Sequence, residues 1–273
     1  MVFIAYINLA RRTDRRAKME TQLAALNLTA RRIEAVTPAD IPSELVERHT
    51  SRRHVEYVHL SELSCSLSHH AALRAFLASG EDFGLILEDD VVLSSSVKDL
   101  IQTPLAGFDV LRLETFFDHQ HHFRTESITL GSFGLHRIAS RCAGTAAYIV
   151  NRHAAVAILE ATHALSRSFD FVLFFPFRRP GSRLKTMQVI PALAAQEHRL
   201  TPRDYDGDIQ QRQDDRPPKP AHLTIPHGLM QFWLSDFEIN LVKTVNRFLG
   251  RTRREVVPMA DTKTAGDAGG AFR

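Results

Sequence analysis

Three adjacent acidic residues are the feature of this sequence that most clearly indicates chemistry. Glu88, Asp89 and Asp90 directly follow the apolar run 83–87, which has the composition of a buried strand. Burial raises the pKa of a carboxyl group and like charges repel, so a cation should offset these three charges. Divalent cations prefer oxygen ligands, and Glu88 and Asp90 would share one face of a continued strand. The pattern favours a metal site over an exposed acidic turn, which is the alternative interpretation.

A second polar cluster opens the helix that we expect over residues 61–77. Glu62, Cys65 and His69 lie three and four positions apart and therefore share one face of that helix. These residue types can bind zinc, but no second Cys–His pair has the spacing of a zinc finger. The spacing favours a capped helix with a buried cysteine over a zinc site.

Four arginines follow the first apolar run, at Arg11, Arg12, Arg15 and Arg16. Guanidinium groups bind phosphate oxygens in a forked geometry, so these side chains could hold a diphosphate. The solvated start of a helix is an equally good interpretation.

A histidine-rich segment contains Asp118, His119, His121 and His122. These side chains could bind a transition metal, but histidine-rich segments are more often solvated. We therefore expect an exposed loop.

Two single carboxyl groups are candidates for a general base. Asp170 lies between Phe169 and Phe171, and Glu114 follows the strand that we expect over 108–113. An apolar setting raises the pKa of a carboxyl group, which suits proton abstraction near neutral pH. Asp170 could instead cap the N-terminus of a helix.

Alternating strands and helices must position these residues. Apolar runs predict strands over 2–7, 33–36, 83–87, 108–113, 146–150 and 187–190. Helical periodicity predicts helices over 14–27, 61–77 and 151–165. This order is typical of an α/β domain with a mostly parallel or mixed sheet, which we place at residues 1–200. The sequence has no Walker loop, Rossmann glycine fingerprint or Gly-x-Ser-x-Gly elbow, which argues against the usual ATPases, dehydrogenases and α/β-hydrolases.

The C-terminal part changes in composition. Residues 201–222 are rich in proline and polar side chains and predict a linker. Residues 223–255 carry apolar side chains at three- and four-residue steps, which predicts an amphipathic helix, and 256–273 predict a disordered tail. The helix could pack on the domain or, through its arginines and lysine, rest on an anionic inner membrane.

Composition limits the classes of protein that the chain can represent. Among its 273 residues, 34 Lys and Arg against 31 Asp and Glu give a net charge of +3, too little to indicate a nucleic-acid partner. Two cysteines build no disulfide framework. No apolar run reaches the roughly 20 residues of a membrane span, and the N-terminus lacks the features of a signal peptide. We expect a cytoplasmic protein.

Taken in order, several segments resemble the motifs of glycosyltransferase family 25, the bacterial lipooligosaccharide galactosyltransferase family. The similar segments are Tyr6-Ile7-Asn8-Leu9 with the arginines after it, 62–69, Leu85 to Val91, 144–148, Asp170, and 191–196. The resemblance covers residues 2–198. Ser64 stands where the family has glycine, and Ser168-Phe169 where it has Pro-Val.

The resemblance implies a GT-A-like fold with flanking helices and an inverting transfer from a UDP-sugar, with galactose as the expected sugar. Its acceptor would be a glycan or glycolipid of lipooligosaccharide or other cell-surface glycan biosynthesis. A divalent cation, usually manganese, would be held by Asp90 and Glu88, and Asp170 would be the general base with Glu114 in reserve. Donor binding is implied for Asn8, Leu9, Arg12, Arg15, Ser68, His69, Glu88 and Asp89.

Two other functions fit the same residues. A metal-dependent phosphodiesterase or nucleotidyltransferase could use the acidic cluster on a phosphorus centre. A catalytically silent relative could bind a sugar nucleotide or glycan without turnover.

Overall fold

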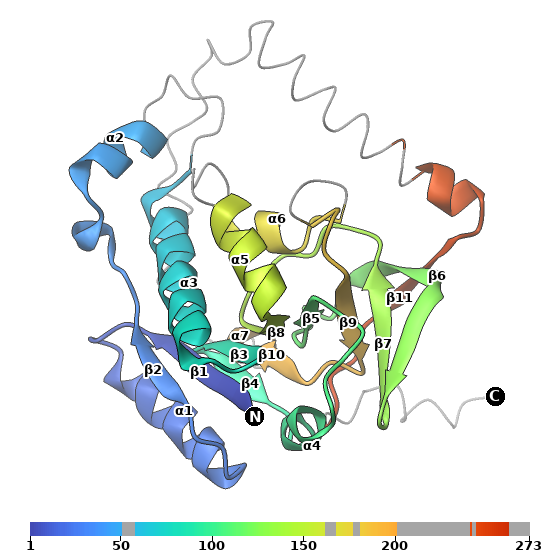
Figure 1. Cartoon of the computed structure of the whole chain (residues 1–273), viewed down its shortest axis with the longest axis horizontal. Helices are drawn as coiled ribbons and strands as arrows, with labels where there is room; N and C mark the ends of the chain where they lie inside the picture. The colour runs from blue at the N-terminus through green and yellow to red at the C-terminus, as the bar shows by residue number, and fades with distance from the viewer. Residues whose placement is uncertain (51–57, 162–167, 177–180, 201–240, 242–243, 262–273) are drawn as a thin grey trace, which may run out of the picture.

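The structure is a computed structural model that describes residues 1–50, 58–161, 168–176, 181–200, 241 and 244–261 (Figure 1). Its strands are β1 (Val2–Asn8), β2 (Arg31–Glu34), β3 (Phe83–Glu88), β4 (Val91–Leu93), β5 (Val110–Arg112), β6 (His119–Leu130), β7 (Phe133–Ile138), β8 (Ala147–Asn151), β9 (Thr186–Ile190), β10 (Ala194–Gln196) and β11 (Thr252–Val256). Its helices are α1 (Thr13–Ala25), η1 (Pro38–Asp40), α2 (Ser43–Thr50), α3 (Leu60–Ser79), α4 (Val97–Gln102), α5 (Arg152–Ala161), α6 (Phe169–Leu173) and α7 (Glu197–Leu200).

A mixed sheet of nine strands forms the centre of the described structure, in the order β11-β6-β7-β9-β5-β8-β3-β1-β2. The pairs β1–β2, β1–β3 and β5–β9 are parallel, and β8 runs antiparallel to both β3 and β5. Strands β4 and β10 form a separate two-stranded sheet. The predicted α/β class with a mixed sheet is therefore confirmed.

Helices cover both faces of the sheet (Figure 1). Successive strand residues point to opposite faces, and in β1 Ile4 and Tyr6 join the core under α1 and α4, whereas Ala5 and Ile7 join the core under α3 and α5. The near-continuous apolar runs of the sequence reflect this burial on both sides. No helix in the described residues combines the length and the apolar composition needed to cross a membrane.

Helix α3 is capped as the sequence predicts. The Glu62 side chain accepts a hydrogen bond from the backbone N–H of His59, and the ring of His59 accepts one from the N–H of Ser61. Gly80 ends the helix with φ of 82°, a left-handed conformation that glycine adopts without strain. Cys65, expected to be buried, is only half-buried.

The histidine-rich segment is not an exposed loop, and that prediction was wrong. His119, His121 and His122 lie in β6, where His122 is fully buried and bonds Glu255 of β11 at 3.0 Å. The hairpin of β6 and β7, paired with β9 and β11, extends the sheet well beyond its expected edge.

The C-terminal boundaries also need correction. Residues 244–248 are helical, but β11 follows at 252–256 where a helix to residue 255 was expected. Residues 257–261, expected in a tail, pack on the domain: the Thr115 hydroxyl donates to the Val257 carbonyl, and Asp261 accepts from Ser94. The domain therefore includes residues beyond 200. The linker 201–222 and most of the expected helix and tail lie outside the described residues.

Candidate active site

A cavity of about 570 Å³ opens at the carboxyl ends of β1, β2 and β3, the edge at which α/β sheets commonly bind ligands. Its walls include side chains from the β1 and β2 loops, α3, the acidic cluster, the loop before β8, α6 and α7. Of the candidate residues named from the sequence, those that line it are Leu9, Arg11, Arg15, Glu62, Cys65, Ser68, His69, Glu88, Asp89, Asp90 and Asp170.

The acidic cluster lies at the centre of this cavity. Strand β3 ends at Glu88, and Asp89 and Asp90 form the turn that leads to β4. The strand alternation expected to pair Glu88 with Asp90 therefore does not continue, yet all three carboxylates line the cavity. The turn brings Asp89 to the same cavity as Glu88 and Asp90, whereas a continued strand would have pointed Asp89 to the opposite face of the sheet.

Asp89 is anchored from β1 and α1. The Asn8 amide donates to Asp89 Oδ2 at 2.7 Å, and Arg15 Nη1 lies 3.2 Å from Asp89 Oδ1 and 3.7 Å from Asp90 Oδ2. Asn8 is 1% exposed and does not line the cavity, so it positions Asp89 rather than contacting a ligand. Arg12, which was expected at the diphosphate, also lies outside the lining and pairs with Asp14 at 3.0 Å.

Glu88 and Asp90 differ in their environments. Burial acts to raise the pKa of Glu88, but hydrogen bonds from His69 and from the Thr145 hydroxyl at 2.8 Å outweigh it, so the pKa is lowered. Burial, and then the charge of Glu88, raise the pKa of Asp90 to about 6, although Gln196 donates to it at 3.3 Å. The charged form is therefore stabilised by its neighbours at Glu88 and destabilised by its surroundings at Asp90.

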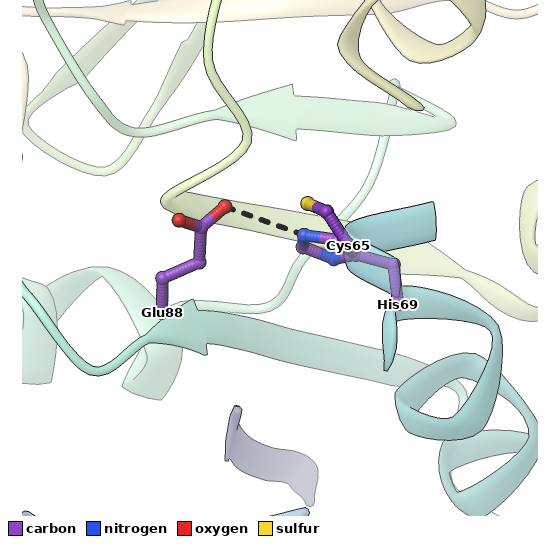
Figure 2. A group of neighbouring side chains, drawn as sticks. All are labelled: Cys65, His69 and Glu88. Atoms are coloured by element: carbon purple, nitrogen blue, oxygen red, sulfur yellow. Dashed lines mark hydrogen bonds and ion pairs between the residues drawn. The ribbon is translucent and has the colours of Figure 1, made fainter. Parts of the chain in front are cut away.

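Cys65, His69 and Glu88 also lie close together, with their potential ligand atoms within 4.8 Å of one another (Figure 2). Glu88 thus takes the place that the sequence pattern gave to Glu62. The imidazole of His69 stacks on Phe169, with ring centroids 4.5 Å apart. Burial raises the pKa of the Cys65 thiol well above its usual value, which disfavours the thiolate that zinc requires.

The donor set therefore fits a hard divalent cation better than zinc. Carboxylate oxygens are the preferred ligands of such ions, and a bound cation would stabilise the charged form of Asp90, which burial and Glu88 disfavour. Glu88 and Asp90 both line the cavity and could hold such an ion.

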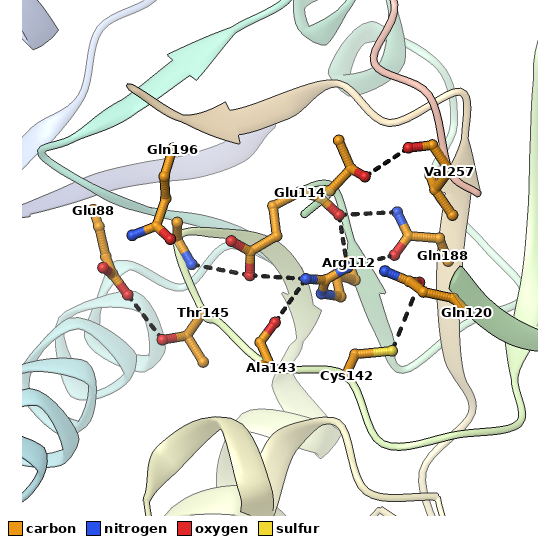
Figure 3. A network of polar contacts seen from close by, with 12 residues as sticks. Glu88, Arg112, Glu114, Gln120, Cys142, Ala143, Thr145, Gln188, Gln196 and Val257 are labelled. Atoms are coloured by element: carbon orange, nitrogen blue, oxygen red, sulfur yellow. Dashed lines mark hydrogen bonds and ion pairs between the residues drawn. The ribbon is translucent and has the colours of Figure 1, made fainter. Parts of the chain in front are cut away.

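Glu114, expected as the reserve base, does not line the cavity, and this expectation needs correction. It is 0% exposed and packs against the loop before β8, where its Oε1 accepts the N–H of Ala146 at 3.2 Å (Figure 3). Arg112 lies 3.5 Å from the same oxygen and donates to the carbonyls of Glu114 and Ala143, each at 2.7 Å. Burial raises the pKa of Glu114 to about 8, although Arg112 acts to lower it.

Gly144 allows this loop to approach Glu114 closely. Its φ is 85°, and a Cβ at this position would lie 2.5 Å from the Phe116 ring and 2.8 Å from Glu114 Oε1. The loop then presents Thr145, whose hydroxyl contacts Glu88 and His69. Buried side chains under the loop thus position a group in the cavity.

Asp170 lies in the first turn of α6 and lines the cavity. Its Oδ1 accepts the N–H of Phe171 at 2.7 Å, so it also stabilises the helix start, although Ser168 is the residue at the N-cap position. Ser68 accepts the N–H of Val36 and donates to the Ser64 carbonyl, both at 2.8 Å, and so ties the loop after β2 to α3.

Several lining residues were given no role from the sequence. Thr145 and Gln196 belong to segments that resemble family motifs, and motif membership was the available signal for them. Arg141, His198 and Arg199 also line the cavity, and no sequence pattern marked them.

The chain is an α/β protein with a carboxylate cluster at the ligand-binding edge of its sheet. Comparison with known sequences shows the family to which it belongs. Residues 1–173 match the family described as glycosyltransferase family 25 (LPS biosynthesis protein). The chain belongs to this family and is a glycosyltransferase. It is 26% identical over 209 residues to the lacto-N-neotetraose biosynthesis glycosyltransferase LgtB of Neisseria gonorrhoeae, covering 70% of this chain and 73% of LgtB.

Solved structures resemble the chain more distantly. A glycosyltransferase involved in glycosylation of the major capsid of PBCV-1 has a TM-score of 0.41 at 9% identity, covering 78% of this chain and 97% of its own. A mannose-1-phosphate geranyltransferase from Thermus thermophilus has a TM-score of 0.38 at 11% identity, covering 70% and 74%.

Proposed function

We propose that this glycosyltransferase has a GT-A-like fold and transfers galactose, with inversion, from a UDP-sugar to a glycan or glycolipid acceptor of lipopolysaccharide or lipooligosaccharide biosynthesis. The observation that carries the proposal is the position of Glu88, Asp89 and Asp90 in a cavity of about 570 Å³ at the carboxyl edge of the sheet. Family membership and the 26% identity to LgtB support the substrate class.

The donor would lie across the sheet edge. Leu9 and Val36, which follow β1 and β2, line the end of the cavity that suits the nucleoside. Arg15 faces the acidic cluster and can meet a diphosphate there, and Ser68 and His69 line the adjoining wall. When bound, a divalent cation such as Mn²⁺, held by Glu88 and Asp90, would supply positive charge that stabilises the leaving diphosphate.

The acceptor would react from the opposite side of the anomeric carbon. Asp170 lines the cavity beyond the acidic cluster and would accept the proton of the attacking hydroxyl. The new glycosidic bond forms as the bond between the sugar and UDP breaks, so the configuration inverts.

A donor-hydrolysis assay tests this function. Purified protein with Mn²⁺ and a panel of UDP-sugars should release UDP from one sugar, and chelation should stop the release. Asp90→Asn should lower the rate by about 100-fold or more, because a preorganised electrostatic group typically contributes that much. The matched control is Asp99→Asn, an exposed aspartate of α4 outside the cavity.

Each other outcome contradicts a part of the proposal. Release of UMP and sugar 1-phosphate instead of UDP would indicate an enzyme that acts on a phosphorus centre. If the protein binds UDP but forms no UDP from any UDP-sugar, even with a panel of glycan acceptors, it would be a catalytically silent relative. Absence of UDP binding would remove the donor assignment altogether.

The same proposal places the enzyme in the cytoplasm, in peripheral contact with the inner membrane. The apolar side chains of Leu241, Val245, Phe248 and Leu249 are exposed, Phe248 at 90% and Leu249 at 51%, and Arg247 and Arg251 are close to them in sequence. This combination supports binding to an anionic bilayer surface. Phe248→Ser should lower flotation with anionic vesicles, and unchanged flotation would contradict the membrane contact.

A further inference from the structure

Two arginines of the cavity wall have no role in the proposed reaction. Arg141, in the loop before β8, and Arg199, in α7, are both exposed and both line the cavity. Neither forms an ion pair with a carboxylate among the residues that the structure describes, whereas Arg15 on the same cavity contacts Asp89 and Asp90. The cavity therefore carries two cationic groups whose charge is not offset by a neighbour in the described chain.

Aromatic rings hold both guanidinium groups in place. The Cζ atom of Arg141 lies 5.0 Å from the centroid of Phe171, and that of Arg199 lies 4.4 Å from the centroid of Phe116. A ring orients a guanidinium group through its quadrupole but carries no net charge. The positive charge and the N–H donors at the edge of each group thus remain available to an anion.

The order of the strands places both arginines at one end of the cavity. Strands β2, β1, β3 and β8 are neighbours in that order, and the N–H of Glu88 donates to the Ala146 carbonyl at 2.8 Å. The loop before β8 therefore lies on the side of the acidic cluster away from β1 and β2. Arg199 belongs to the same wall, because it lies over Phe116, the ring that closely faces Gly144.

We propose that Arg141 and Arg199 form a subsite for an anionic group, a phosphate or a carboxylate, carried by the acceptor glycan. This rests on the proposed function: a donor with its nucleoside at β1 and β2 and its diphosphate at Glu88–Asp90 leaves this end of the cavity to the acceptor. Asp170, the assigned base, precedes Phe171, the ring under Arg141, so the subsite adjoins the reacting hydroxyl. The enzyme would thus prefer a charged acceptor over its neutral counterpart.

The test uses three sugars that differ in charge: glucose-6-phosphate, glucuronate and glucose. Their binding is measured by ligand-observed NMR with the full chain saturated with UDP and Mg²⁺, so that the diphosphate position is already filled. The wild-type protein should bind both anionic sugars at least about fivefold more tightly than glucose, because each charge-assisted hydrogen bond favours them. The two anions together show whether phosphate or carboxylate fits better.

Arg141→Gln and Arg199→Gln should each lower the affinity for the anionic sugars toward that for glucose and leave UDP affinity unchanged. The matched control, Arg74→Gln, replaces an exposed arginine of α3 outside the cavity and should change neither. Equal binding of the three sugars to the wild-type protein would overturn the subsite. Lower UDP affinity in the two variants would instead assign these arginines to the donor. Failure of the wild-type protein to bind UDP would contradict the proposed function itself. That result can be distinguished from equal binding of the three sugars and from lower UDP affinity in the variants.

Discussion

Two carboxyl groups, those of Glu88 and Glu114, lie at the same edge of the sheet and differ in access to solvent. Glu88 ends β3 and Glu114 follows β5, and these strands run in the same direction because both are antiparallel to β8 between them. Glu88 lines the cavity, whereas Glu114 is 0% exposed below residues 143–146. The loop before β8 therefore decides which carboxylate can react: it covers one and, through Thr145, orients the other.

The largest expected effect distinguishes the two candidate bases. Asp170→Asn should lower kcat by about 10²–10⁴-fold, the usual contribution of a general base, and leave UDP affinity nearly unchanged. Glu114→Gln should change kcat far less, because Glu114 does not line the cavity. Steady-state kinetics with UDP-binding measurements checks both variants. A fully active Asp170→Asn variant together with an inactive Glu114→Gln variant would reverse the assignment.

A smaller effect concerns the stability of the buried group. Glu114 has its pKa raised from 4.5 to about 8, chiefly by burial, so the folded state holds a proton that the unfolded state releases. The stability associated with this group is fully present below about pH 4.5 and is lost as the pH rises through about 8. Glutamine cannot ionise and lacks this dependence.

The free energy of unfolding of Glu114→Gln, relative to that of wild type, should therefore rise by about 3–4 kcal/mol as the pH is raised from about 5 to about 8. Urea unfolding at the two pH values measures the difference, and an exposed variant such as Glu160→Gln is the control. A variant that is less stable than wild type at the higher pH would show that Glu114 is ionised and that its pairing with Arg112 outweighs burial.

The parts predicted well from the sequence are those that local pattern determines. Strands β1, β3 and β8 are apolar runs because both faces of the sheet are covered, and α3 begins at a capping box. The acidic cluster, Ser68, His69 and Asp170 line one cavity because they lie at or near the carboxyl edge of the sheet. An edge shared by strands far apart in sequence follows from α/β topology alone.

The parts that were missed depend on contacts distant in sequence. His122 is buried because β11 covers it, and the alternation of β6 is too polar to indicate a strand by itself. Glu114 is inaccessible because residues 143–146 lie over it, and Arg141 and Arg199 gain their position from rings that no local pattern links to them. Turn geometry at Asp89 and Asp90 likewise replaced the expected strand alternation.

The position of β11 has a consequence for how the chain is made. Residues 252–256 pair with β6, and Val257 and Asp261 bond to Thr115 and Ser94, so contacts that complete the sheet join segments separated by about 130 positions or more. A ribosome that has synthesised residues 1–173, the part that matches the family, has yet to supply β9 and β11. The edge of β6 thus stays open to other strands until residues 252–256 emerge, which exposes the hairpin to chaperones and proteases during that time.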